Sequence, residues 1–171
     1  MGWEVIGSLN YPKKCIVIAA PHTSNWDFLI GRCYGYICGV TPKYLIKSSF
    51  FMPVLGAFLK WNGGIPVYRN AKHNVVEHLE ERFNSTDDLI LAITPEGTRS
   101  RVEKWKTGFY HIANNANLPI LLLAMDYKNK KVGIINQFIP TDDIEKDMLF
   151  IQEQFKNIEG KIPEKYNPII L

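Results

Sequence analysis

His22 and Asp27 lie five residues apart, directly after the apolar run Cys15–Ala20. An imidazole with one ring nitrogen held by a carboxylate keeps its other nitrogen free to act as a general base. The two side chains can meet if His22 lies in a turn and Asp27 in the first turn of the next helix. They would then stand at the carboxyl end of a strand, where α/β sheets bind ligands. This interpretation predicts a base that takes a proton from a hydroxyl group or from water.

The same spacing has a simpler interpretation. Ser24 could cap the following helix, with Asp27 three residues later near the capping-box position. An aspartate there also suits the positive end of the helix dipole. His22 would then be an ordinary polar residue at a strand end, and spacing alone leaves both interpretations open.

Two later segments carry residues suited to an anionic ligand, "GGIPVYR" (Gly63–Arg69) and "PEGTRS" (Pro95–Ser100). In each, glycine is combined with an arginine, whose guanidinium can bind phosphate through two parallel hydrogen bonds. Gly97 allows the backbone to approach a ligand closely. Each segment alone is typical of an ordinary turn, and both gain weight from following His22 and Asp27. The candidates for phosphate binding are Arg69, Glu96, Gly97, Thr98 and Arg99, with Lys47 and Lys106 as further cations.

The elements that must position these residues alternate between strands and helices. Apolar runs predict strands at 15–20, 43–47, 65–68, 89–93, 119–125 and 132–138. Helical patterns occupy 24–38, 53–61, 70–83, 107–116 and 142–158. This alternation favours a single α/β domain over residues 1–171, with a mixed, largely parallel central sheet flanked by helices. We expect an antiparallel piece near the C-terminus.

Composition narrows the classes of partner. A net charge of +3 gives no reason to expect nucleic acid but permits phosphates, coenzyme A or acidic lipid headgroups. The three cysteines form no CxxC pair, so we expect neither a metal site nor disulfides, and a reducing cytoplasmic setting. No segment resembles a signal peptide or a spanning helix. The aromatic segment Ser48–Gly64 is either a core helix or an apolar surface that lines an acyl-chain groove or dips into a bilayer, where the protein would be peripheral on the cytoplasmic face.

Taken together, the motifs resemble the glycerolipid acyltransferase family, which includes the lysophosphatidic acid acyltransferases. That family has four ordered blocks, and the first, a histidine followed four residues later by an aspartate, is matched by His22–Asp27. The second, a glycine-rich strand ending in arginine, is matched by Gly63–Arg69. A Glu-Gly-Thr-Arg-Ser segment is matched fully by Glu96–Ser100, and a proline within an apolar strand by Leu118–Ile120.

The resemblance implies an O-acyltransferase of phospholipid biosynthesis, with acyl transfer from acyl-CoA or acyl carrier protein to a glycerol-phosphate or lysophospholipid hydroxyl. His22 would be the general base, oriented by Asp27, with no acyl-enzyme and no metal or redox cofactor. The acceptor headgroup would lie against Arg69 and the segment Glu96–Arg99. We expect backbone N–H groups near the start of the Ser24 helix to stabilise the oxyanion.

Two departures and two alternatives stand beside this reading. Tyr68 occupies a position that is acidic in many relatives, which puts the acceptor's identity in question. Only 21 residues precede His22, fewer than in many relatives, which puts membrane attachment in question.

A catalytically idle relative that binds acyl groups or lipid is one alternative. A hydrolase, in which His22 activates water on a thioester, is the other, although water needs no arginine clamp.

Overall fold

One seven-stranded sheet organises the chain in the computed structural model, which describes residues 2–7, 10–68 and 72–170. The strand order is β1-β7-β6-β2-β5-β3-β4. Every neighbouring pair is parallel except β6 and β7, which form an antiparallel hairpin. The strands are β1 (Glu4–Gly7), β2 (Lys14–Ala20), β3 (Lys43–Lys47), β4 (Gly64–Val67), β5 (Leu89–Ile93), β6 (Ile120–Asp126) and β7 (Lys131–Phe138).

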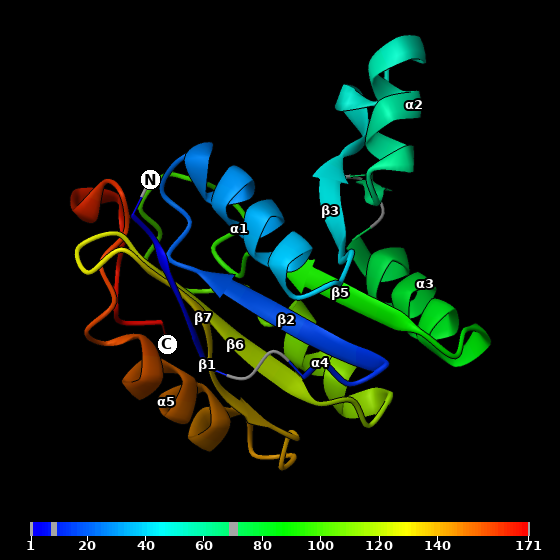
Figure 1. Ribbon diagram of the computed structural model, residues 1–171. Coiled ribbons are helices and arrows are strands. Elements are labelled where there is room, and N and C mark those ends of the chain that lie inside the picture. The colour runs from blue at the N-terminus through cyan, green and yellow to red at the C-terminus, as the bar shows by residue number, and fades with distance from the viewer. Residues whose placement is uncertain (1, 8–9, 69–71, 171) are drawn as a thin grey trace.

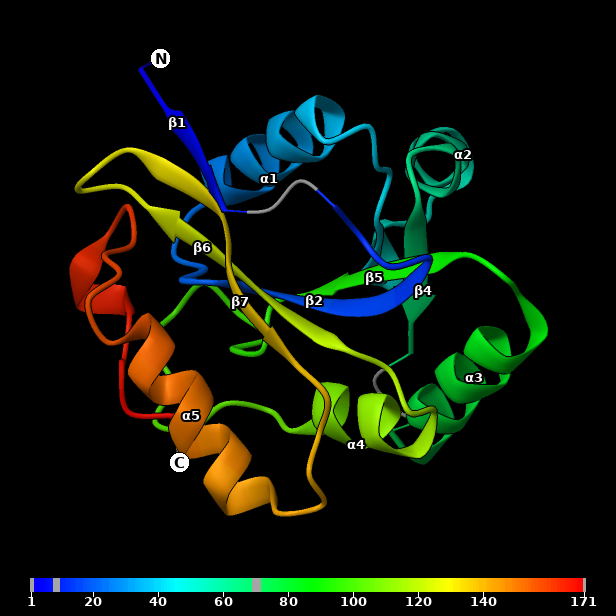
Figure 2. The same cartoon turned by 60° about the horizontal axis from the view of Figure 1, so that its bottom comes forward.

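Helices cover both faces of this sheet (Figures 1 and 2). On one face lie α3, α4 and α5, and on the other lies α1. A further helix, α2, stands out beyond the β3–β4 edge (Figure 1). The α-helices are α1 (Trp26–Ile37), α2 (Pro53–Trp61), α3 (Lys72–Ser85), α4 (Gly108–Asn115) and α5 (Ile144–Phe155), and the short 3₁₀ helices are η1 (Ser48–Phe50) and η2 (Pro163–Lys165).

Strand β2 shows why this sheet is buried on both faces. Successive side chains of a strand point to opposite faces, and every residue of β2 after Lys14 is buried. Ile16, Ile18 and Ala20 pack toward α3, α4 and α5, whereas Cys15, Val17 and Ala19 pack toward α1. An unbroken apolar run is what such a two-sided position requires. The chain therefore leaves the core only at the end of β2, where Pro21 and His22 follow.

The predicted α/β class and the largely parallel sheet with an antiparallel C-terminal piece are confirmed. Each expected strand and helix occurs, with ends shifted by a few residues at most. The sequence analysis missed β1, whose four residues pair in parallel with β7. Four residues with charged Glu4 at one end carry too little periodicity to predict a strand.

Candidate active site

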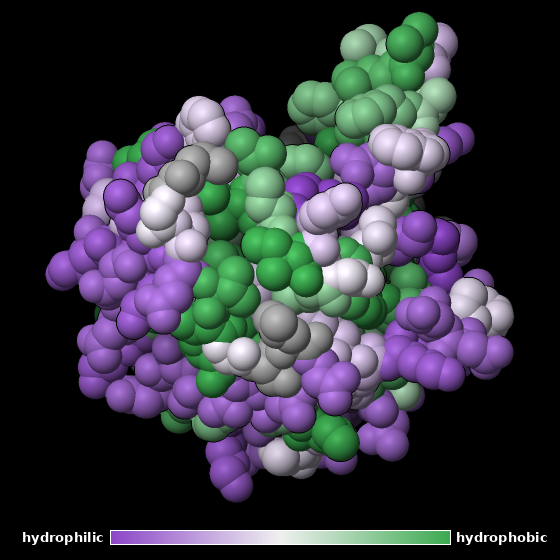
Figure 3. All heavy atoms as spheres, viewed as in Figure 1, coloured by the Kyte–Doolittle hydropathy of each residue, from purple (hydrophilic) through white to green (hydrophobic). Residues whose placement is uncertain are grey.

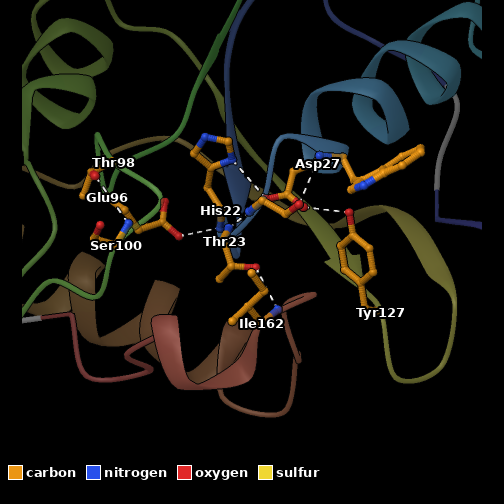
Figure 4. Close-up of polar contacts among 10 residues, drawn as sticks. His22, Thr23, Asp27, Glu96, Thr98, Ser100, Tyr127 and Ile162 are labelled. Carbon is orange, nitrogen blue, oxygen red and sulfur yellow. Dashed lines mark hydrogen bonds and ion pairs between the residues drawn. The ribbon is translucent and has the colours of Figure 1, made fainter.

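The site lies at the carboxyl ends of β2, β5 and β6, which are parallel neighbours in the sheet. His22 follows β2, Glu96 follows β5 and Tyr127 follows β6, so three loops distant in sequence meet at one edge. Figure 4 shows the imidazole of His22 between the carboxyl groups of Glu96 and Asp27, with Tyr127 beyond Asp27. This edge is where open α/β sheets place their ligands.

His22 and Asp27 face each other as the sequence analysis expects. Nδ1 of His22 lies 3.1 Å from Oδ2 of Asp27. A carboxylate only accepts, so Nδ1 carries the proton and Nε2 keeps its lone pair. The described residues make no hydrogen bond to Nε2, and the His22 side chain is 20% exposed. The imidazole thus combines a fixed tautomer with a free basic nitrogen that solvent can reach.

Asp27 is held by four donors and is 2% exposed. Besides His22, Oδ2 accepts from the backbone N–H groups of Thr23 at 2.7 Å and Ser24 at 2.8 Å, and Oδ1 accepts from the Tyr127 hydroxyl at 2.6 Å. Burial acts to raise the pKa of Asp27, but the hydrogen bonds from His22, Tyr127, Ser24 and Thr23 lower it overall. Asp27 is therefore an ionised carboxylate whose orientation is fixed from all sides.

The capping interpretation of Asp27 holds at the same time as the pairing with His22. By accepting from Thr23 and Ser24, the carboxylate turns back over the residues that precede α1, much as a capping box does. Ser24 contributes through its hydroxyl, which accepts from the N–H of Trp26 at 3.2 Å. One aspartate both ties down the start of α1 and holds the imidazole, so the two interpretations are not exclusive.

Four backbone N–H groups near the start of α1 are already engaged in hydrogen bonds. The N–H groups of Thr23 and Ser24 donate to Asp27, that of Trp26 donates to the Ser24 hydroxyl, and that of Asp27 donates to the Ser24 carbonyl. An N–H that satisfies a carboxylate cannot also receive a developing oxyanion at full strength. These four N–H groups are therefore poor oxyanion donors, and the expectation that N–H groups near the start of the Ser24 helix supply the oxyanion site stays a prediction.

Glu96 lies behind His22 instead of opening toward solvent. It is 5% exposed, and its Oε1 accepts from the backbone N–H of His22 at 2.8 Å. Burial raises the pKa of Glu96 to about 7, against the opposing effect of its hydrogen bonds. The residue that the motif places in the headgroup site therefore joins the β5 loop to the main chain of the proposed base.

The remaining phosphate-binding candidates are spread around this centre. Gly97 has φ of +64°, and a side chain there would strike the Lys106 ammonium, since an added Cβ would lie 2.5 Å from Nζ. Thr98 accepts from the N–H of Ser100 at 3.3 Å. Arg99 is exposed and, among described residues, its side chain has no hydrogen bond or ion pair. Lys106 thus folds over the turn at Gly97, two residues before exposed Arg99.

One further candidate makes no hydrogen bond or ion pair with this cluster among the described residues. Lys47 is exposed at the end of β3, and the described residues make no ion pair with it. Arg69 lies outside the described residues. Tyr68, the departure noted in the second block, is exposed beyond the end of β4.

Two contributors to the site were missed by the sequence analysis. Tyr127 reaches Asp27 from 100 residues away, and Thr23 accepts from the N–H of Ile162 at 3.2 Å, which ties the C-terminal segment to the site. The parallel register that pairs Ala20 with Ala124 could have indicated Tyr127, because residues just beyond paired positions emerge at the same edge. Nothing local in the sequence marks Ile162.

The described residues contain no group of three or more His, Cys, Asp or Glu side chains that could hold a metal ion. They also contain no helix long and apolar enough to cross a bilayer.

Comparison with known proteins then decides the family. The Acyltransferase family model matches residues 3–126, which include the His22 loop, the Gly63–Arg69 segment and the Glu96 loop. The chain belongs to the acyltransferase family.

Relatives within the acyltransferase family carry similar names. A 1-acyl-sn-glycerol-3-phosphate acyltransferase of Haemophilus influenzae is 31% identical over 66% of this chain and 48% of its own length. A probable 1-acyl-sn-glycerol-3-phosphate acyltransferase of Mycoplasma pneumoniae is 28% identical over 71% of this chain and 48% of its own length. The chain thus spans about half the length of these curated relatives.

A solved structure has the same fold as this acyltransferase-family chain. It is the 1-acyl-sn-glycerophosphate (LPA) acyltransferase PlsC from Thermotoga maritima, with a TM-score of 0.58 and 20% identity. The match covers 92% of this chain and 73% of the other. The likeness therefore covers more of the chain than the family model, which matches residues 3–126.

Proposed function

We propose that this protein transfers a fatty acyl group from a thioester, acyl-CoA or acyl carrier protein, to a hydroxyl of a glycerol-phosphate or lysophospholipid acceptor. The proposal is carried by one observation, the imidazole of His22 with Nδ1 fixed by buried Asp27 and Nε2 free. Membership of the acyltransferase family and the names of the relatives support the same chemistry.

In the proposed reaction Nε2 of His22 takes the proton of the acceptor hydroxyl as its oxygen attacks the thioester carbonyl carbon. A new C–O bond forms, the C–S bond breaks, and the thiolate leaves with the proton that His22 returns. Asp27 keeps the imidazole in the right tautomer and stabilises its charged form. The imidazole supplies the base, so the proposal includes no metal or redox cofactor and no acyl-enzyme.

The acceptor's phosphate is assigned to the cations beside the Gly97 turn. Arg99 and Lys106 are both exposed there, and Arg69 is added on the motif alone. A guanidinium binds phosphate through two hydrogen bonds, and an ammonium adds a point charge. A lysophospholipid acceptor and the acylated product are amphiphiles, so we place the protein in the cytoplasm, in peripheral contact with the membrane face.

The test is an assay with labelled acyl-CoA or acyl carrier protein and a panel of glycerol phosphates and lysophospholipids. Ester product supports transfer, free fatty acid alone would indicate a hydrolase, and neither product would indicate an idle binding relative. His22→Ala should lower the rate by about a hundredfold to ten-thousandfold, the range for losing a general base.

His78→Ala is the matched control, because His78 is an exposed histidine on α3. It should leave the rate unchanged, and chelation by EDTA should have no effect on either protein. Equal rates for His22→Ala and wild type would contradict the proposed mechanism.

A further inference from the structure

Helix α2 and the turn before it form an exposed apolar surface, which we call the apolar projection. Lys60 is the only charged residue of α2, and Val54 and Trp61 are 86% and 81% exposed. Figure 3 shows apolar side chains gathered over the part of the molecule that Figure 1 labels α2. A helix that is apolar on nearly every side is normally buried. The large exposed residues of the projection are Phe50, Met52, Val54, Leu55, Phe58 and Trp61.

The projection is a built feature with a defined base. Gly56 packs on the backbone of Phe51, where an added Cβ would lie 2.8 Å from the carbonyl carbon. Leu59 is buried, and its carbonyl oxygen packs closely against Gly64. A Cβ added to Gly64 would lie 2.9 Å from that oxygen. Gly56 and Leu59 therefore form one narrow buried strip by which α2 packs toward β4, and the rest of the helix faces outward.

Helix α1 adds apolar surface on the same side of the sheet (Figures 1 and 2). Trp26, Phe28 and Leu29 are exposed at its start, and Tyr36 and Ile37 at its end. The start of α1 is also the part of the chain that carries Asp27. An object that contacts the projection and this flank of α1 therefore lies close to the candidate active site.

Charge is distributed unevenly along the sequence that contains the projection and most of α1. Between Asp27 and Glu77 the sequence contains no Asp or Glu but six Lys and Arg residues. The whole chain has 20 basic and 17 acidic residues, so the other residues carry 14 basic and 17 acidic ones, a net −3. The basic residues of the segment are Arg32, Lys43, Lys47, Lys60, Arg69 and Lys72.

We propose that the apolar projection and the exposed flank of α1 dock into an anionic lipid surface. Apolar and aromatic side chains would enter the headgroup–acyl boundary, while lysines and arginines meet anionic headgroups. The inference rests on the proposed function with an amphiphilic lysophospholipid as the acceptor, and it names the surface of the protein and the lipid class that would bring the two together. A second copy of the chain is disfavoured as the occupant, because two surfaces with this excess of basic residues repel each other.

The experiment measures sedimentation of purified protein with vesicles of phosphatidylglycerol or of phosphatidylcholine alone. We expect affinity for the anionic vesicles to exceed that for the neutral ones by about tenfold or more, since each cation near a charged surface contributes. Val54→Ser combined with Trp61→Gln should reduce binding to phosphatidylglycerol about tenfold by removing inserted apolar area. The control pair Leu149→Gln and Ile139→Ser removes exposed apolar residues on α5 and just beyond β7, and should bind as wild type does.

Charge is tested separately. Lys60→Glu should weaken binding to anionic vesicles about tenfold. Lys146→Glu, an exposed lysine in the first turn of α5, should not weaken it, although both variants change the net charge equally. A blue shift of tryptophan emission on binding that is smaller in Trp61→Phe would support insertion of the projection, with Trp26 on the α1 flank accounting for the remaining shift.

Three outcomes would overturn the inference. One is the absence of wild-type binding to anionic vesicles. Another is equal binding by the Val54/Trp61 variant and its control pair. The third is a wild-type oligomer, seen by sedimentation velocity, that only the Val54/Trp61 substitutions dissociate, because a protein surface would then cover the projection.

This test is independent of the catalytic proposal. Vesicle binding needs no acyl donor, so His22→Ala should bind as wild type does even though its transfer rate falls. Conversely, the Val54/Trp61 variant should keep the wild-type rate with a short-chain acceptor that is monomeric in water. If the docking inference alone fails, transfer persists without vesicle binding; if the catalytic proposal alone fails, binding persists without transfer.

Discussion

Two buried carboxylates on opposite sides of the sheet, Asp27 and Asp147, make an instructive pair. Asp27 is 2% and Asp147 is 4% exposed. Each accepts from a tyrosine hydroxyl, Tyr127 at 2.6 Å and Tyr110 at 2.9 Å, and each accepts from backbone N–H before its own helix. By these criteria both are well-satisfied carboxylates that fix the start of a helix.

The difference lies in the last donor. Asp147 receives its remaining hydrogen bond from the Thr141 hydroxyl at 3.0 Å, whereas Asp27 receives it from the imidazole of His22. A threonine hydroxyl has no proton to exchange near neutral pH, but an imidazole that reaches solvent does. A buried carboxylate is thus a general structural device, and its partner determines whether it can serve catalysis.

The largest expected difference between the two carboxylates is in the acyl-transfer rates of the variants Asp27→Asn and Asp147→Asn. An amide placed among N–H donors loses hydrogen bonds, so each variant should lower the free energy of unfolding by about 1–3 kcal/mol. Only Asp27→Asn should also lower the acyl-transfer rate, by about a hundredfold, because the tautomer of His22 is no longer fixed. Urea denaturation and initial rates measure both quantities. A similar rate loss for Asp147→Asn would remove the distinction between the two sites.

How far the sequence predicts these features depends on how local they are. The pairing of His22 with Asp27 is contained in one short loop, so residue types and spacing indicated it, although spacing alone did not decide between pairing and capping. The proximity of the Glu96 loop follows from parallel strands ending at one edge. Tyr127 and Ile162 come from distant segments, and only the strand register and the path of the C-terminal segment bring them to Asp27 and Thr23.

Helix α2 shows a different limit. Its sequence, PVLGAFLKW, was compatible with a core helix or with an interfacial one, because composition does not tell which face is covered. The fold class was easier, since alternating apolar strands and amphipathic helices have few packing solutions. Exposure of α2 is a tertiary property, decided by how few elements pack on it.

The second prediction concerns Glu96, a buried carboxyl that, unlike Asp27 and Asp147, has an oxygen, Oε2, without a described donor. Burial raises the pKa of Glu96 from 4.5 to about 7, so the folded protein binds a proton there that the unfolded chain has released. The resulting stability is fully present below pH 4.5 and is lost as pH rises through about 7. The loss should be on the order of 3 kcal/mol.

Glu96→Gln should remove this decline, because an amide does not titrate. The measurement is urea denaturation of wild type and Glu96→Gln across that pH range, with the difference between the two isolating the Glu96 contribution. Glu103→Gln is the control. It alters an exposed carboxyl later in the sequence and should keep the wild-type slope of stability against pH. Parallel curves for wild type and Glu96→Gln would show that burial does not raise the pKa of Glu96.

The smallest expected effect comes from the two tyrosines. Tyr127→Phe and Tyr110→Phe each remove one hydroxyl from a buried carboxylate, so each should cost about 1 kcal/mol of stability. The Tyr127 hydroxyl is one of the donors that lower the pKa of Asp27. Without this hydroxyl the pKa of Asp27 should rise. Because His22 is oriented by the ionised carboxylate, the loss of rate on acidification, which is the acid limb of the pH–rate profile, should then begin at a higher pH.

Tyr110→Phe should leave that profile in place, since Asp147 touches no group of the proposed reaction. The rate at the optimum should fall only severalfold in Tyr127→Phe, because His22, Thr23 and Ser24 still hold Asp27. The measurement is the initial rate of wild type and of both tyrosine variants from about pH 5 to 9. An unchanged acid limb in Tyr127→Phe would reduce this tyrosine to the structural role that Tyr110 has, and the distinction between the carboxylates would then depend on the imidazole alone.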